Sequence, residues 1–587
     1  MSDQTKRSIS QILHRHGPGS LIYIDECDVI AKVSNLRADP DVGVNRRRLH
    51  RRVVDKMQRW RDNGGIVFGV ADVGAIEEKD IAPLRPRQVE WEPYGIWYAC
   101  DRVNCGVMHK ETDADFNGRC RLCGGGLKQL PYVYYHHCGS FAEMEPTPTF
   151  ACPTPGHGLR YIAFHDTHDL PTSYWVCRQP GCDHRKKTFY PPCRLQACRA
   201  RPGDHKNYQI SHWRDQWVYY AQNVDYVNLD DGQALPFVKS DLGVDLAHSA
   251  ILGEVPAGRR RLAAMLRAAG GDCPNCGFNV TPGWKVCPNC ANPLPQSSSA
   301  NVRLPLDLDD GRVTWAVLRD LDESRNVRNV VNDQPVGTIN STSRGFDAML
   351  RQGIYDVVLV KEFPLTTALI GYTRNRSDHQ SWLRPFPRRD EKYVVYTDSI
   401  GTEAWMVQLS AKAIVAWLRA NGLSASDGTL PTSNDENELK LWLIGKIVAQ
   451  DESIIEAVEP LLHTFSHVLL YNLAVSCGLE PSSLGELIMT DALAFAIYAG
   501  DSELGALTAA FEQMLDVVMD GVTDFTTCKF DPGCREDDKG SCIGCVHLPR
   551  GCALFNESLS RAYLFGGPVE SALATKVLGF VGVAATL

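Results

Sequence analysis

The chain has 587 residues, enough for roughly three to five domains of ordinary size. Its hydrophobic fraction of 44% and charged fraction of 22% are typical of a folded soluble protein, and no apolar run reaches the ~18 residues of a membrane span. A net charge of −9 excludes a uniformly basic coat for nucleic acid. Because the opening MSDQTKRSIS carries no apolar signal segment, we expect a cytoplasmic protein without a membrane partner.

Residues 1–95 are expected to form an N-terminal α+β region, with a strand at Leu21–Ile24. The stretch Arg46–Arg61 is strongly basic and predicts an amphipathic helix, because apolar residues recur at spacings of four, four and three. These apolar residues are Leu49, Val53, Met57 and Trp60. The candidate nucleic-acid contacts on its cationic side are Arg47, Arg48, Arg51 and Arg52. A solvated helix face and a docking surface for an acidic partner are the alternatives.

Residues 96–210 are rich in cysteine, proline and glycine and poor in helical periodicity, which is typical of metal-stapled knuckles. Most of the 21 cysteines in the chain occur in clusters of short spacing. The C-x2-C pairs are Cys120/Cys123, Cys273/Cys276, Cys287/Cys290 and Cys542/Cys545. The C-x4-C pairs are Cys100/Cys105, Cys177/Cys182 and Cys193/Cys198. In a reducing cytoplasm such pairs indicate zinc sites rather than disulfides.

The order of the pairs predicts how the cysteines share metal ions. A first site takes Cys100, Cys105, Cys120 and Cys123, and another takes Cys177, Cys182, Cys193 and Cys198. Between them, Cys138, Cys152 and His157 plus one unknown ligand could form a further site, with His136 and His137 nearby. Because ligands of that site could interleave with the Cys177–Cys198 set, its composition stays open.

Residues 211–300 are expected to be a helical segment that carries a zinc ribbon at 273–290 and a linker at Pro293–Ala300. The ribbon has two CPxC knuckles, which makes it the most specific metal signal in the chain. Its ligands are Cys273, Cys276, Cys287 and Cys290.

Residues 301–420 predict a central α+β region, and 421–587 a mainly helical, Cys-rich C-terminal domain. The expected strands are Tyr355–Val360, Tyr393–Tyr396 and Ala404–Leu409. The expected helices are Ala411–Leu418, Leu439–Ala449, Ile454–Val475 and Leu504–Met519, with a loop at Asn421–Glu438. The fold class is therefore α+β, multidomain, with several zinc-ribbon or zinc-knuckle modules.

The C-terminal cluster offers five cysteines for about four ligand positions. We expect Cys534, Cys542, Cys545 and Cys552 to bind the metal, with Cys528 spare. In total the ligands predict about four to five zinc ions, although an iron–sulfur cluster is an alternative at this last site. Closed four-ligand sites are structural, because they leave no position for water or substrate.

His463 and His467 lie at i and i+4 of a predicted helix, as in zinc proteases, and Glu486 could supply a third ligand. However, Thr464 occupies the position where HExxH carries its general base, so hydrogen-bonded core histidines are the preferred interpretation. The sequence also has no phosphate loop, no dinucleotide-binding GxGxxG after a strand, and no GxSxG nucleophile elbow. We therefore expect no catalytic residues and no enzyme activity.

Several stretches together resemble the DrmB family of the bacterial DISARM anti-phage system. GPGS (Gly17–Ser20), FPLTTALIGYTR (Phe363–Arg374) and GTEAWMVQL (Gly401–Leu409) are similar to the opening and middle of that family. The C-terminal part resembles an uncharacterised helicase-associated domain. The stretches that carry this second similarity are HTFSH (463–467), GELIM (485–489), YAGDSELGALTAAF (498–511) and CIGCVHLPRGCALFNESLSR (542–561). One departure is SELGALTAA, where the family has a more glycine-rich stretch, so Ala506 replaces a glycine.

The resemblance implies a non-catalytic accessory and scaffold subunit that partners DrmA, a superfamily-two helicase-like ATPase, and binds DNA within that complex. Two alternatives belong to other classes. One is a metal-dependent hydrolase or nuclease that uses His463 and His467. The other is a stand-alone zinc-ribbon DNA-binding protein, which would show salt-sensitive DNA affinity without any partner.

Overall fold

The structure is a computed structural model that describes residues 3–5, 7–167, 172–188, 190–200, 206–229, 238, 241–253, 273, 275–278, 286–294, 306–307, 310–319, 324–500, 505–537, 540–548, 552, 554, 556–568 and 576–587. The chain forms two compact units. Unit 1 comprises Met1–Val224 and Thr367–Asp398, and unit 2 comprises Asp225–Thr366 and Ser399–Leu587. Residues 367–398 belong to the predicted central segment 301–420 but pack in unit 1. The five-part division of the chain stays a prediction.

Unit 1 is built mainly from strands. The long antiparallel pair β3 (Val29–Pro40) and β4 (Ile81–Pro93) is flanked by β2 (Leu21–Ile24) and β1 (Asp3–Thr5). β4 also pairs in parallel with the first residues of β18 (Tyr393–Leu409). The helix α1 (Ile9–His14) begins at a capping box of Ser8 and Gln11 and buries its apolar side in this core.

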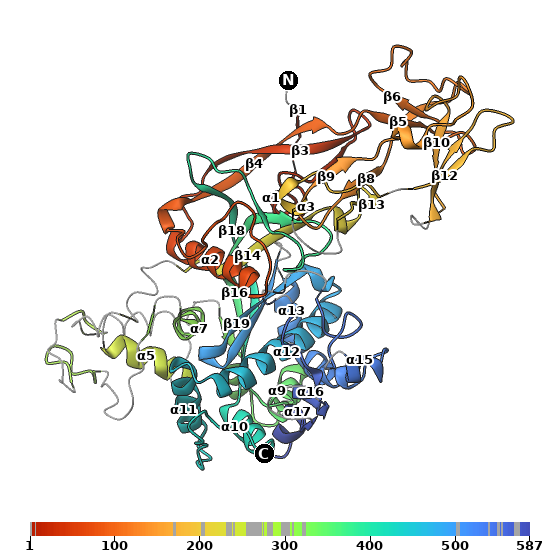
Figure 1. Cartoon of the computed structure of the whole chain (residues 1–587). Coiled ribbons are helices and arrows are strands. Elements are labelled where there is room, and N and C mark those ends of the chain that lie inside the picture. Colours follow the sequence, from red (N-terminus) through yellow and green to blue (C-terminus); the bar gives the residue numbers. More distant parts are fainter. Residues whose placement is uncertain are drawn as a thin grey trace. The chain divides into compact units, whose positions relative to one another are not determined.

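Three small antiparallel sheets carry the cysteine-rich part of unit 1, and their strands are labelled in part in Figure 1. The first sheet is β5 (Trp97–Cys100), β6 (Met108–Lys110) and β7 (Leu127–Gln129). The second is β8 (Tyr132–Tyr135), β9 (Phe141–Glu143) and β13 (Gln209–His212). The third is β10 (Ile162–His165), β11 (Tyr174–Cys177) and β12 (Arg185–Lys187). Further elements of unit 1 are α2 (Arg46–Asp62), α3 (Gln196–Arg199), β17 (Arg384–Pro385), most of β14 (Tyr220–Val227) and the end of β16 (Ile354–Thr373).

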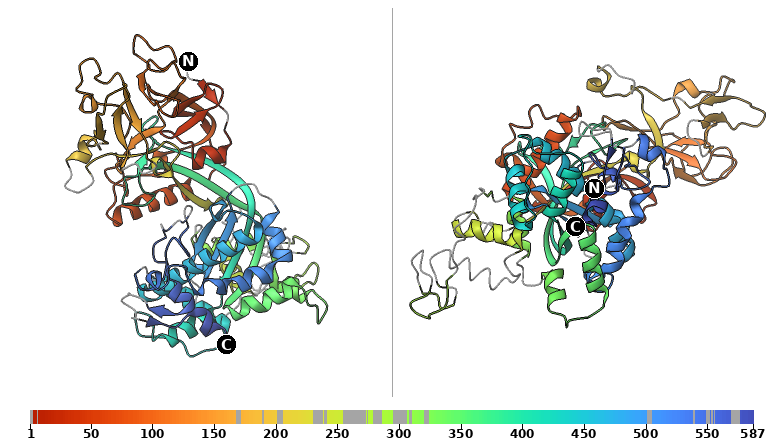
Figure 2. Two further views of the ribbon diagram at one scale, coloured as in Figure 1. Left: turned by 90° about the vertical axis from the view of Figure 1, so that its right-hand side faces the viewer. Right: turned by 90° about the horizontal axis from the view of Figure 1, so that it is seen from below.

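Unit 2 is mainly helical and centres on the 26-residue helix α12 (Glu452–Cys477). Residues on every side of its middle turns are buried, which explains the almost continuous apolar pattern of this stretch. It packs against the hairpin of β19 (Leu484–Met489) and β20 (Ala494–Ala499), and β20 pairs with the second half of β18. The later helices of this unit, teal to blue in Figure 2, gather against its strands.

The other elements of unit 2 complete this core. Its further helices are α5 (Asp241–Leu252), α7 (Gly311–Arg319), α8 (Val327–Asn332), α9 (Ser341–Arg351), α10 (Ala411–Ala420), α11 (Glu436–Val448), α13 (Ala506–Gln513), α14 (Leu515–Asp520), α15 (Gly533–Asp537), α16 (Arg561–Phe565) and α17 (Phe580–Ala584). Its further strands are β15 (Arg325–Asn326), β21 (Gly567–Pro568), β22 (Lys576–Val577) and part of β16 (Ile354–Thr373).

The predicted α+β class with a helical C-terminal part is confirmed, and the differences concern the ends and the continuity of single elements. α11 begins at Glu436, three residues before its predicted start, because Asp435 accepts a hydrogen bond from the backbone N–H of Glu438 and caps the helix. The single helix predicted for Leu504–Met519 is two helices, since the backbone leaves helical geometry at Met514. The predicted linker at Pro293–Ala300 lies mostly outside the described residues. Among the helices in the described ranges, none combines the length and apolarity that crossing a bilayer requires.

Candidate metal centres

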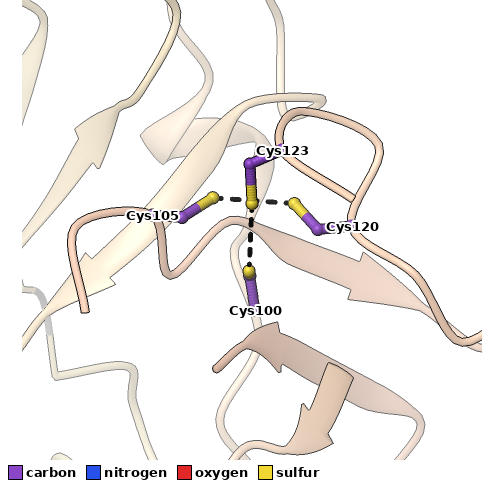
Figure 3. Close-up of side chains that lie close together, drawn as sticks. All are labelled: Cys100, Cys105, Cys120 and Cys123. Carbon is purple, nitrogen blue, oxygen red and sulfur yellow. Dashed lines mark hydrogen bonds between the residues drawn. The ribbon is translucent and has the colours of Figure 1, made fainter. Parts of the chain in front are cut away.

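The first cluster joins the three strands of one small sheet. Cys100 ends β5, Cys105 lies in the turn before β6, and Cys120 and Cys123 lie in the turn before β7. Figure 3 shows their four sulfur atoms converging on one point. The Sγ atoms of Cys100 and Cys123 are 3.5 Å apart, and those of Cys105 and Cys120 are 3.6 Å apart. We call this the Cys100 cluster, and it has the predicted membership.

These separations are those of ligands around one ion. Four sulfurs at about 2.3 Å from a tetrahedral centre lie about 3.8 Å from one another. A disulfide instead needs an S–S distance of about 2.05 Å. The Cys100 cluster therefore has the geometry of a closed metal site such as a zinc site.

Two further clusters in unit 1 correct the predicted sets. The predicted site of Cys177, Cys182, Cys193 and Cys198 does not exist as one group, and Cys138 does not share a site with Cys152. The His136 cluster consists of His136, Cys138, Cys193 and Cys198. The Cys152 cluster consists of Cys152, His157, Cys177 and Cys182. Within both clusters, neighbouring Sγ–Sγ and Sγ–Nδ1 pairs are separated by 3.2 to 3.6 Å.

Strand pairing explains this exchange of ligands. β13 pairs with β8, so the chain that carries Cys193 and Cys198 returns beside His136 and Cys138. β10 and β11 form a hairpin whose register sets Cys177 opposite Ile162, near the loop of Cys152 and His157. One cluster is thus nested inside the other along the chain. His136 is not among the ligands predicted from the sequence. The sequence feature that indicates its role as a ligand is the His-x-Cys spacing between His136 and Cys138.

The ribbon at 273–290 keeps its predicted membership, and we call it the Cys273 cluster. Its Sγ atoms are 3.6 Å apart between Cys273 and Cys290, and 3.7 Å apart between Cys276 and Cys287. Backbone N–H groups of Gly277 and Ala291 bond back to the carbonyls of Cys273 and Cys287 and close both knuckles. The two knuckles thus present four sulfurs to one point.

The C-terminal cluster contains Cys528 in place of Cys552, which corrects the predicted choice. The Cys528 cluster consists of Cys528, Cys534, Cys542 and Cys545. Hydrogen bonds hold Cys528 in the cluster. The Asp531 carboxylate accepts one from the backbone N–H of Cys528 (2.8 Å) and another from Nη2 of Arg561 (2.8 Å). The same Nη2 lies 3.5 Å from Sγ of Cys534. Cys552 instead lies against His463.

The electrostatics of the clusters favour a bound cation. Backbone N–H groups two residues on donate to the sulfurs of Cys120, Cys528 and Cys542 at 3.3–3.4 Å. The N–H of Gly125 lowers the pKa of Cys123 to about 7, whereas burial raises the pKa of Cys105. One thiol of this cluster therefore ionises readily while a second resists, because burial disfavours its charged form. A divalent cation offsets the cost of burying these charges and allows all the thiolates to ionise.

His463 and His467 face a carboxylate rather than an open cleft. Both histidine side chains and that of Glu486 are 0% exposed. Glu486 Oε1 lies 3.3 Å from Nε2 of His463 and 2.9 Å from Nε2 of His467. Burial lowers the pKa of His463, but Glu486 and Cys552 outweigh it and raise that pKa to about 9. A hydrolytic centre requires a position open to substrate, whereas these three side chains are fully buried and leave substrate no access.

The basic helix α2 forms as predicted, and Asn45 caps its start by accepting from the N–H of Arg48 (3.1 Å). The apolar residues Leu49, Val53, Met57 and Trp60 are buried as expected. Arg48 is also buried, which corrects its assignment to the DNA-facing side. Arg47 and Arg52 are exposed, and Arg51 is half-buried. Of the four arginines predicted to contact nucleic acid, only Arg47 and Arg52 are therefore exposed on the helix surface.

The comparisons with known proteins concern mainly unit 1. A family model described as a domain of unknown function (DUF8724) matches residues 8–229. No curated protein matches the chain. The matched range contains α2 and the Cys100, His136 and Cys152 clusters, so three of the candidate metal centres lie within the part of the chain that this family model matches.

Proposed function

We propose that the protein is a non-catalytic accessory and scaffold subunit of an anti-phage defence complex. The observation that carries this proposal is the set of five clusters, each with its four ligand positions filled by protein side chains. Closed sites hold a fold together and leave no vacancy for a reactant. The three clusters in the DUF8724 range staple short strands that could not bury a sufficient core alone.

The metal in these clusters is zinc in our proposal. Sets of four cysteines, or of three cysteines and one histidine, at tetrahedral spacing are the ligand sets of structural zinc. Zinc binding at each cluster would contribute to the free energy of folding, because the unfolded chain has no preformed site for the ion.

The partner follows from the resemblance to DrmB. We propose that the protein binds DrmA, a superfamily-two helicase-like ATPase, and contacts DNA in that complex. Because this chain has no phosphate loop, we propose that the partner hydrolyses ATP and that this protein does not. Co-expression of the two proteins followed by size exclusion tests this step. Elution as separate species at micromolar concentration would leave the scaffold proposal without support.

Two basic features of unit 1 support a DNA contact. The first is the exposed arginine side of α2. The second is a cleft of about 590 Å³ whose lining includes Arg37, Arg87, Arg388 and Arg389. Two of these arginines are paired with carboxylates, Arg37 with Glu90 and Arg87 with Asp39. Helix α2 is the first target for mutation, because Arg46, Arg47 and Arg52 are exposed on one helix.

Replacing Arg46, Arg47 and Arg52 by Gln should weaken DNA binding by the complex and reduce its salt dependence. Each lost phosphate contact should flatten the slope of log K against log[salt] by about 0.9 on duplex DNA. The buried apolar side of α2 should tolerate the change, because these three side chains are exposed. Fluorescence anisotropy over a salt series measures the slope.

A matched control replaces Lys186 and Lys187, which are exposed on β12, by Gln. Its slope should stay close to that of the wild type. If both variants keep the wild-type slope, α2 is a solvated face. If the α2 variant no longer assembles with its partner, the helix is a protein-docking surface.

A further inference from the structure

Four potential ligands from three distant segments meet inside unit 2, outside the five clusters already described. His463 and His467 come from α12, Glu486 from β19, and Cys552 from the segment that follows the Cys528 cluster. Nε2 of His463 lies 3.1 Å from Sγ of Cys552 and 3.3 Å from Oε1 of Glu486. Nε2 of His467 lies 2.9 Å from the same carboxylate oxygen. The i, i+4 spacing places both imidazoles on one face of α12.

The hydrogen bonds around His467, Glu486 and Cys552 orient the lone pairs of these side chains toward the centre of the group. Nδ1 of His467 lies 2.6 Å from the carbonyl oxygen of Val546, which can only accept, so this nitrogen carries a proton. In the neutral imidazole, Nε2 then presents a lone pair toward Glu486, which is itself an acceptor. The second oxygen of Glu486 accepts from the hydroxyl of Ser466, and the sulfur of Cys552 accepts from the N–H of Asn556 (3.2 Å). Facing lone pairs need either a proton or a metal ion between them, and the test below distinguishes the two.

A divalent metal satisfies both charge and distance. Two neutral imidazoles, one carboxylate and one thiolate carry two negative charges, which a divalent ion cancels in this buried setting. Around a tetrahedral zinc ion, nitrogen and oxygen ligands lie about 3.4 Å apart, and nitrogen and sulfur ligands about 3.6 Å apart. The observed 2.9–3.3 Å separations require shifts of only a few tenths of an ångström. The hydrogen bonds to Val546 and Ser466 resemble the outer partners that orient metal ligands.

We propose that His463, His467, Glu486 and Cys552 form a sixth metal site, which binds zinc. The site is closed, because Cys552 takes the position that a catalytic zinc would leave to water. It joins the central helix, the β19–β20 hairpin and the C-terminal segment of unit 2. This role goes beyond the proposed scaffold function and does not depend on it.

The direct test is a crystal structure of the full chain with anomalous data collected on both sides of the zinc absorption edge. We expect a zinc peak enclosed by Nε2 of His463, Nε2 of His467, Oε1 of Glu486 and Sγ of Cys552. Peaks at the Cys clusters, without one here, would overturn the proposal and leave a buried imidazolium–carboxylate pair. This test needs no variant and does not depend on how well a mutant folds.

Metal analysis of variants gives a second test. His467→Ala and Cys552→Ser should each hold one zinc fewer per chain than the wild type. Cys27→Ser, which changes an exposed thiol, should keep the wild-type content. Ser466→Ala should keep the metal but release it faster to a chelator, because only the carboxylate's outer partner is lost. Equal zinc content in wild type, His467→Ala and Cys552→Ser would contradict the sixth site.

Discussion

The double variant Cys177→Ser/Cys193→Ser should lose two zinc ions per chain relative to the wild type. Cys177 lies in the Cys152 cluster and Cys193 in the His136 cluster, so the two substitutions damage separate sites. Binding of structural zinc is worth about 10–16 kcal/mol, and a serine hydroxyl cannot replace the anionic thiolate that the ion requires. Zinc content per chain, measured by mass spectrometry on the folded monomer peak, decides the result.

The matched control is Cys177→Ser/Cys182→Ser, which removes two ligands from the Cys152 cluster alone. It should lose one zinc ion. The order of cysteines along the sequence assigns Cys177, Cys182 and Cys193 to one site. It therefore predicts that both double variants lose the same single zinc ion. A loss of a single ion from both double variants would therefore restore the sequence-based set and reject the nested arrangement.

The comparison of these two clusters shows what sequence spacing can and cannot predict. Spacing identifies two thiols that belong to one turn, because that relation is local, and every C-x2-C and C-x4-C pair does enter a common cluster. The partner of each pair is decided by strand pairing over a long stretch of chain. β13 lies beside β8 across more than 70 positions of sequence, and Gln209 opposite Tyr135 is a contact that no local pattern reports.

The same distinction applies to the helices and to single residues. The long helix α12 was predictable, since its apolar residues run through many turns and require a buried position. The membership of Cys528 depends on Arg561, Asp531 and the fold of the intervening loop. The burial of Arg48 depends on what packs against α2, which hydrophobic periodicity alone does not contain. The meeting of Cys552 with His463 was likewise beyond local patterns.

A further long-range contact in unit 1 joins two of the stretches that resemble DrmB. Arg374, at the end of FPLTTALIGYTR, is fully buried. Its Nη2 donates to the carbonyl of Gly19 in GPGS (2.7 Å), its Nε to that of Gly139 (3.0 Å), and its Nη1 to that of Val218. The adjacent Gly17 has no room for a side chain, because a Cβ there would collide with the hydroxyl of Tyr219. The loop therefore packs closely against Tyr219 and Leu369.

Replacing Arg374 by Leu should destabilise unit 1 by roughly 3–5 kcal/mol, because it leaves three backbone carbonyls buried without their donors. Arg374→Lys should also destabilise it, since an ammonium group lacks the planar fork that reaches three acceptors. Denaturant unfolding, together with faster amide exchange in the peptide that contains Gly17–Ser20, measures the effect. The control Arg376→Leu removes a half-exposed arginine that pairs with Asp378 (3.1 Å), and it should cost less than about 1 kcal/mol. Similar losses in both variants would mean that the three carbonyls do not depend on Arg374, and unchanged exchange at Gly17–Ser20 would show that the arginine does not hold that loop.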